Sequence, residues 1–301
     1  MRILLTGTSG QVGGALLPLL HKRGTVLAPN ETELDLTRLD ALVGQLDELK
    51  PDFIVNPAAY TAVDKAEDDA ALASRINAEA PSVIAGWAAA RKVPLVHFST
   101  DYVYDGSGSR AWREDDPTGP LSVYGRSKLA GEEAVRRAGG PHLVVRTAWV
   151  YAAKGANFMR TMLRLARERE TLRVVADQWG TPTSARTIAA SLTEIIDRGL
   201  ADLPAAFDRG GRLVHLTNSG STNWHGFASA ILDGLRKRGV ALKATAVVPI
   251  TTADYPTKAV RPANSRLDLT RLQTVYGVSP LAWQEALTME LDALIAAGEQ
   301  I

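Results

Sequence analysis

The sequence predicts an α/β protein, with a Rossmann-type doubly wound parallel sheet and a smaller mixed α/β substrate-binding domain. Short strands that are apolar throughout alternate with helical segments over the first half of the chain, which is typical of a parallel sheet covered on both faces. A glycine-rich turn follows the first strand at once and opens the first helix. Such sheets bind ligands beyond the carboxyl ends of their strands, where the chain order switches.

Apolar periodicity and turn residues define the elements of the first half. Pro51 ends one helical stripe of leucines, and Pro94 precedes the strand that runs into Ser99-Thr100-Asp101. We predict strands at residues 2–6, 25–28, 52–56, 95–98 and 142–146, and helices at residues 11–23, 39–49, 64–91 and 123–138.

The pattern is looser after about residue 150. We predict helices at residues 158–169, 186–199, 223–238 and 281–297, and a strand at residues 213–217. Residues 1–150 are therefore expected to form a dinucleotide-binding domain, to which a segment near 186–217 returns. Residues 151–185 and 218–301 are expected to form the substrate-binding domain.

Composition excludes several classes of function. The 301 residues include 34 basic and 33 acidic side chains, so a net charge of +1 gives no reason to expect a nucleic-acid or acidic-membrane partner. No cysteine is present, which excludes a disulfide framework and a thiolate zinc site and fits a cytoplasmic enzyme. No apolar run reaches the roughly 18 residues of a transmembrane helix.

Glycines 7, 10 and 13 predict a phosphate cradle. Gly7 permits a tight turn, Gly10 lets the backbone approach a pyrophosphate, and Gly13 permits close packing of the helix on the strand. The helix that follows offers free N–H groups and the positive end of its dipole to the phosphates. Because a strand precedes the loop and a helix follows it, we expect a bound dinucleotide.

The loop after the second strand leaves the choice between NADPH and NADH open. A dinucleotide fingerprint has an acid about 20 residues on, which binds the adenosine 2′-hydroxyl. Asn30 stands there instead, and it neither repels a 2′-phosphate nor pairs with it by charge. Asp35 and Leu36 are expected near the adenine, although Asp35 could equally be the N-cap of the next helix.

Tyr124 and Lys128 are the candidate catalytic pair. Residues four apart share a helix face, so Lys128 can stand beside Tyr124 and lower its pKa from about 10 toward the working range of an acid–base group. Thr100, at the end of the fourth strand, can bind a carbonyl oxygen beside Tyr124. A tyrosine and lysine at this spacing occur by chance on many helices, but here they follow a dinucleotide cradle in the right order.

These residues lie in stretches that resemble the dTDP-4-dehydrorhamnose reductases, a family of extended short-chain dehydrogenase/reductases. The resemblance runs over nearly the full length. Its parts are TGTSGQVG at 6–13, NPAAYTAVDKAE at 56–67, STDYVYDG at 99–106, YGRSKLAGE at 124–132, RTAWVYAAKGANF at 146–158, DQWGTPT at 177–183 and RPANSRLD at 261–268. The glycine loop and the Tyr-Lys pair mark the superfamily only. Three stretches are much more specific: Thr-Asp-Tyr-Val-Tyr, Arg-Thr-x-Trp-Val-Tyr and Arg-Pro-x-Asn-Ser.

The resemblance implies a reduction at C4 of a dTDP-linked 4-keto sugar by NADPH or NADH. Thr100 would bind the C4 oxygen, Tyr124 would protonate it, and Lys128 would hold the nicotinamide ribose. The remaining cofactor contacts would come from residues of the first and third strand loops, namely Gly10, Gln11, Val12, Ala59, Tyr60 and Thr61.

The same resemblance implies the substrate contacts. Asp101 and Trp149 would face the sugar, although Trp149 could also be a core residue. Contacts to the diphosphate could come from Arg261, Asn264 or Ser265, or these three could belong to a loop fixed by hydrogen bonds.

One departure from the family concerns a metal. Some members carry Glu just after the GQVG turn and join two subunits through a metal there, whereas this chain has Gly14-Ala15. We therefore expect no metal, and either a monomer or a homodimer.

Two other functions remain open on this fold. One is a sugar-nucleotide epimerase or 4,6-dehydratase, but related dehydratases have Glu as a base where this chain has Tyr102. The other is a regulatory subunit of methionine adenosyltransferase, which would not need intact Thr100, Tyr124 and Lys128.

Overall fold

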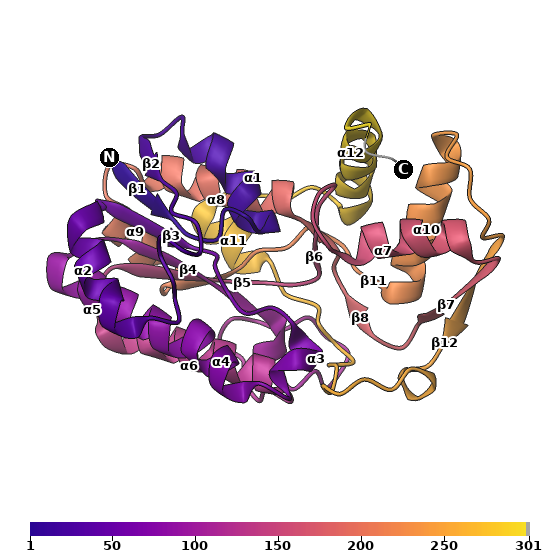
Figure 1. Cartoon of the computed structure of the whole chain (residues 1–301), viewed down its shortest axis with the longest axis horizontal. Coiled ribbons are helices and arrows are strands. Elements are labelled where there is room, and N and C mark those ends of the chain that lie inside the picture. Colours follow the sequence, from indigo (N-terminus) through magenta and orange to yellow (C-terminus); the bar gives the residue numbers. More distant parts are fainter. Residues whose placement is uncertain (299–301) are drawn as a thin grey trace.

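Six parallel strands form the central sheet of the computed structural model, which describes residues 1–298 (Figure 1). Their order is β10–β5–β4–β3–β1–β2, with every neighbouring pair parallel. The strands are β1 (Arg2–Leu5), β2 (Thr25–Leu27), β3 (Phe53–Asn56), β4 (Leu95–Thr100), β5 (His142–Thr147) and β10 (Leu213–His215). The predicted Rossmann-type class is confirmed, and the order reverses between β1 and β3, where such sheets bind their ligand.

Side chains of alternating strand residues pack into two cores, one on each face of the sheet. Ile3 and Val55 pack with α1 (Gln11–Leu20) and α8 (Ala185–Gly199). Leu4 and Ile54 pack on the opposite face with α2 (Leu39–Leu49), α5 (Ala80–Arg91) and α6 (Val123–Ala138). The inner strands β3, β4 and β5 are buried at every residue, which explains why their sequences are largely apolar.

The helix predicted over residues 64–91 is wrong as a single element. The chain instead forms α3 (Val63–Ala66), α4 (Ala70–Ser74), a π-helical turn η1 (Arg75–Glu79) and α5. Asp69 caps α4 by accepting a hydrogen bond from the Leu72 N–H at 3.4 Å. Pro81 has no N–H to donate to Asn77, four residues earlier, so the helical ladder is interrupted at the π turn.

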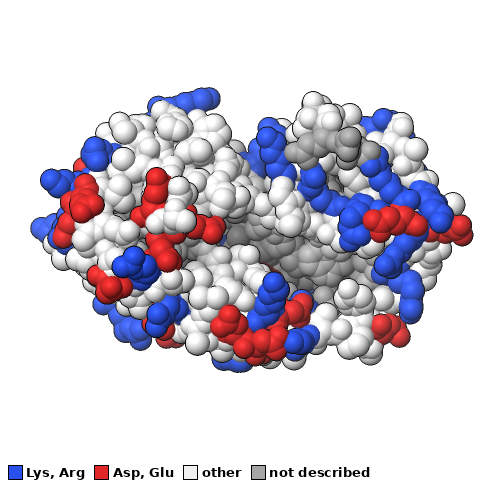
Figure 2. Space-filling view, viewed as in Figure 1, with Lys and Arg blue, Asp and Glu red and all other residues white. Residues whose placement is uncertain are grey.

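A second, smaller part has its own core on the other side of a hollow (Figures 1 and 2). It contains α7 (Phe158–Glu168), α10 (Trp224–Lys237) and α12 (Trp283–Ala296), all three predicted to within three residues. Three short strand pairs were not predicted: β7 (Thr171–Val175) with β12 (Ala246–Ile250), β8 (Trp179–Gly180) with β11 (Thr222–Asn223), and β6 (Val150–Tyr151) with β9 (Thr183–Ser184).

Two short helices outside the prediction pack on the sheet. Leu203 and Phe207 of α9 (Leu203–Arg209), and Leu272 and Tyr276 of α11 (Thr270–Tyr276), belong to the core beneath α1 and α8. Residues 270–278 thus contact the sheet, although the sequence assigned them to the substrate-binding domain. Within residues 1–298, no helix combines the length and apolar character needed to cross a bilayer.

Candidate active site

The glycine loop between β1 and α1 has the geometry of a phosphate cradle. Gly7 lies in the left-handed region at φ +60°, and a Cβ there would come within 2.9 Å of the Ala58 backbone. A Cβ on Gly13 would lie 2.2 Å from the Gly7 carbonyl oxygen, so α1 approaches the loop as only glycine permits. Gly10, the N-cap of α1, makes no side-chain cap, which leaves the N–H groups of the first turn for an anion.

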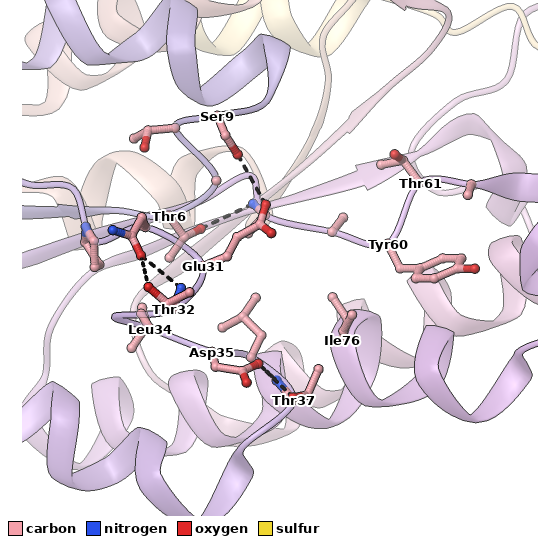
Figure 3. Close-up of a pocket in the computed structure, with 18 residues that line it drawn as sticks. Thr6, Ser9, Glu31, Thr32, Leu34, Asp35, Thr37, Tyr60, Thr61 and Ile76 are labelled. Carbon is pink, nitrogen blue, oxygen red and sulfur yellow. Dashed lines mark hydrogen bonds between the residues drawn. The ribbon is translucent and has the colours of Figure 1, made fainter. Parts of the chain in front are cut away.

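A cavity of about 880 Å³ opens beside this loop (Figure 3). Its walls come from the segments after β1, β2 and β3 and include seven predicted cofactor residues: Gly7, Asn30, Asp35, Leu36, Ala59, Tyr60 and Thr61. Gly10 and Gln11 line a neighbouring cavity of about 520 Å³, on the side of α1 that faces residues 152–155. The Val12 side chain packs on the core of the sheet, so only its backbone is free to meet a ligand.

Asn30 and Asp35 both use their side chains to shape the loop after β2. Oδ1 of Asn30 accepts hydrogen bonds from N and Oγ1 of Thr32, at 2.9 and 2.6 Å. Oδ1 of Asp35 accepts from N and Oγ1 of Thr37, at 2.8 and 2.7 Å, and these bonds lower the pKa of its carboxyl. Asp35 is therefore not a helix N-cap, since that position before α2 belongs to Arg38.

Tyr124 and Lys128 lie on α6, next to the end of β4. Ser122 caps this helix by accepting a hydrogen bond from the Gly125 N–H at 3.1 Å. A Cβ on Gly125 would come within 2.3 Å of the Tyr102 carbonyl oxygen, so the helix presses directly on the segment after Thr100. This contact brings the phenol of Tyr124 beside the Thr100 hydroxyl.

The electrostatics of this pair differ from expectation in one respect. Burial raises the pKa of Tyr124 to about 12, and the nearby Thr100 hydroxyl only partly offsets this rise. Burial also lowers the pKa of Lys128 to about 8, against an upward effect of Glu132. The prediction that the pKa of Tyr124 lies below its ordinary value is therefore wrong for the free protein, because loss of hydration outweighs the favourable effect of Thr100.

Asp101 and Ser265 meet beside Thr100. Oγ1 of Thr100 donates a hydrogen bond to Oδ1 of Asp101 at 2.9 Å. The other carboxylate oxygen, Oδ2, is buried and has no hydrogen-bond partner among the described residues. Burial raises the pKa of Asp101 to about 6, while the nearby Ser265 and Thr100 hydroxyls oppose the rise. A buried polar oxygen beside the reactive hydroxyls indicates a place where a polar ligand is received.

Trp149 combines backbone strain with a fixed ring. Its φ of +49° is unusual for a bulky residue, and its ring stacks on Trp224 with centroids 3.6 Å apart. A Cβ on Gly180 would lie 2.5 Å from the same ring. Trp149 is half-buried between the two parts of the molecule, so it belongs neither to a closed core nor to an open surface.

The segment at 261–265 is held mainly by the protein itself. Arg261 forms a bidentate ion pair with Asp64, at 2.6 and 3.1 Å. Nδ2 of Asn264 donates to the carbonyl oxygens of Ser107 and Arg110, and Oδ1 accepts from Arg266. These contacts agree with the alternative of a loop fixed by hydrogen bonds.

Asn77 is a site residue that the sequence analysis missed. Its side chain accepts from the Tyr60 N–H at 2.8 Å and donates to the Tyr60 carbonyl and to Oγ of Ser127, both at 3.0 Å. It therefore joins the loop after β3 to the helix that carries Tyr124 and Lys128. Pro81, four residues on, was the available signal, since it interrupts the helix at this asparagine.

Together, the parallel sheet, the glycine cradle and the Thr-Tyr-Lys cluster define a Rossmann-fold protein of the short-chain dehydrogenase/reductase type. The model of the family described as RmlD substrate binding domain matches residues 1–295, so the chain belongs to the RmlD family. No group of three or more His, Cys, Asp or Glu side chains that could hold a metal occurs among residues 1–298.

Relatives support the same assignment. A dTDP-4-dehydrorhamnose reductase of Burkholderia thailandensis is 47% identical over 292 residues, covering 95% of this chain and 97% of that protein. The crystal structure of such a reductase from Clostridium acetobutylicum has a TM-score of 0.88 at 35% identity, covering 98% and 100% of the two chains. One from Bacillus anthracis in complex with NADP has a TM-score of 0.86 at 31% identity, covering 97% and 99%.

Proposed function

We propose that the chain is a dTDP-4-dehydrorhamnose reductase, which converts dTDP-4-dehydro-L-rhamnose to dTDP-L-rhamnose with NADPH or NADH. The observation that carries this proposal is the contact of Thr100 with Tyr124, one helical turn from Lys128 and beside the glycine cradle. Relatives that cover nearly the whole chain carry the same activity in their names.

The glycine loop fits a dinucleotide. The N–H groups of Gln11, Val12 and Gly13 at the start of α1 would bind the pyrophosphate, and the cavity walls at Asp35 and Leu36 would receive the adenine. When bound, the nicotinamide supplies the hydride that reaches C4 of the sugar. Lys128 would hold the nicotinamide ribose.

Tyr124 is the general acid in this mechanism. With a pKa of about 12 it is fully protonated near neutral pH, and it remains a far stronger acid than the alcohol that forms at C4. The Thr100 hydroxyl, which donates to Asp101 in the free protein, would turn to donate its hydrogen bond to the same oxygen and stabilise the charge that develops there. The proton on Tyr124 passes to the C4 oxygen as the hydride arrives, and solvent later restores it.

Asp101 and Ser265 would bind the sugar, because they lie beside the Thr100 hydroxyl. Trp149, stacked on Trp224, would also face the sugar. We assign Arg261 and Asn264 a supporting role, since their polar groups are engaged with Asp64 and with the loop. Tyr102, whose ring meets Tyr124 edge-on at 5.5 Å, provides no carboxylate base, which favours a reductase over a dehydratase.

The proposal extends to the domains, the location and the assembly of the protein. The first 150 residues and the return segment would bind the dinucleotide, and the rest would bind the nucleotide sugar. The protein would act in the cytoplasm as a monomer or homodimer, without a nucleic-acid partner.

The proposal is tested by NAD(P)H oxidation with the dTDP-linked 4-keto sugar generated in situ, and with the UDP analogue as the control. Turnover with the dTDP sugar and isolation of dTDP-L-rhamnose are expected. Copurification with a methionine adenosyltransferase, without turnover, would instead indicate the regulatory subunit.

A further inference from the structure

An acidic side chain lies at the adenosine end of the cofactor cavity. Glu31 lines the cavity directly after β2, and its Oε1 accepts a hydrogen bond from Oγ of Ser9 in the glycine loop at 3.3 Å (Figure 3). This bond joins the loops that follow β1 and β2. In Rossmann folds the ribose 2′ position lies between these loops.

The adenosine end of the cofactor cavity is negatively charged. Glu31 and Asp35 both line the cavity, and none of the described residues in its wall is Lys or Arg. Glu33 adds a third carboxylate to the same loop, where it accepts a hydrogen bond from the Asn30 N–H at 2.8 Å. Acidic side chains also group on the sheet-bearing part beside the hollow (Figure 2).

Two cations nearby do not reverse this balance. Arg38 acts on Asp35, whose pKa it helps to lower, and Nη1 of Arg75 donates to the Thr37 carbonyl oxygen at 3.4 Å. Both contacts are at the Asp35–Thr37 side of the loop. Neither cation is paired with Glu31, whose side chain makes one hydrogen bond among the described residues, with Ser9.

We propose that Glu31 selects NADH over NADPH. A carboxylate can accept a hydrogen bond from a ribose 2′-hydroxyl, whereas a 2′-phosphate carries about −1.5 to −2 charges and would be repelled. The inference rests on the proposed function for the identity of the dinucleotide. It sets this chain apart from the Bacillus anthracis relative, which binds NADP.

The direct test is a competition experiment in which ADP or 2′,5′-ADP displaces NADH from the whole protein in the absence of sugar. Displacement is measured by the fluorescence of bound NADH. Wild type should bind ADP at least about tenfold more tightly than 2′,5′-ADP. Glu31→Gln should reduce this ratio to near unity, and Glu31→Lys should invert it. The control is Glu48→Gln, which removes an equal charge from an exposed site on α2 and should leave the ratio unchanged.

Equal or tighter binding of 2′,5′-ADP by wild type, or an unchanged ratio in both Glu31 variants, would overturn the proposal. The experiment needs no sugar, so failure of the proposed reductase activity would not affect its outcome. If the activity is present, the ratio of kcat/KM for NADH to that for NADPH should change in the same direction in each variant.

Discussion

The hydroxyls of Tyr124 and Thr100 are in contact, but they have different tasks. Replacing Tyr124 by Phe keeps the ring and removes only the proton donor. We expect Tyr124→Phe to lower kcat by about 10²–10⁴-fold and to leave the NADH dissociation constant nearly unchanged. Thr100→Val removes one hydrogen bond at nearly constant volume and should have a smaller effect.

Steady-state kinetics paired with fluorescence titrations of NADH measure these effects. If Tyr124→Phe kept more than about a tenth of the wild-type kcat, Tyr124 would not be the general acid. The regulatory-subunit alternative would then gain support.

Lys128 sets an expected pH dependence. Its pKa of about 8 lies below its ordinary value of 10.5, so the ammonium loses its proton as the pH rises through about 8. Since kcat/KM reports ionisations of the free enzyme, it should fall above about pH 8. Lys128→Arg keeps its charge, so the decline near pH 8 should be absent from whatever activity remains. A wild-type profile that is flat from pH 7 to pH 10 would contradict this account.

Residue identity allowed the catalytic cluster to be predicted, but not its electrostatics. A spacing of four residues on a helix placed Tyr124 and Lys128 on one face. The depth of burial and the contact with Thr100 depend on how α6 meets β4, which a local pattern does not encode. The same holds for Arg261, whose partner Asp64 is 197 residues away in the chain.

At the scale of elements, α6 is positioned by glycines that permit close contact. A Cβ on Gly131 would come within 2.1 Å of the Asn77 carbonyl oxygen, in the π turn. Gly131→Ala should therefore push α6 away from η1. We expect this variant to lose about 1–3 kcal/mol of unfolding free energy and to have a lower kcat.

Gly86→Ala is the matched control, because Gly86 is an exposed position of α5 with nothing within 4 Å of the added Cβ. That variant should gain up to about 1 kcal/mol from helix propensity and keep its activity. Thermal denaturation and kcat check both variants. Wild-type stability and activity in Gly131→Ala would show that the contact does not position the helix.

The elements that were predicted best are long and have a periodic stripe of apolar residues. The missed elements are short or carry mixed signals. Strand β12 contains Pro249 and is largely exposed, both of which argue against a strand by pattern, and it is formed by pairing with β7 some 75 residues earlier. Helices α9 and α11 have seven residues each, too few to show a clear period.

At the scale of the whole molecule, we expect the protein to need no metal. Ala15 lines the cavity beside α1 and offers no ligand oxygen from its side chain, whereas magnesium needs oxygen ligands in near-octahedral geometry. EDTA should leave both kcat and the subunit state unchanged, as measured by steady-state assay and size-exclusion chromatography with light scattering. Loss of either on chelation, restored by magnesium, would contradict the expectation.

The fate of the transferred hydrogen tests the central claim most directly. The protein is given dTDP-4-dehydro-L-rhamnose and NADH deuterated at the transferring face of the nicotinamide, and the product is analysed by NMR and mass spectrometry. We predict one deuterium per molecule of dTDP-L-rhamnose, located at C4 of the sugar, with formation of NAD⁺ in equal amount. Unlabelled product, or deuterium at another carbon, would contradict the account.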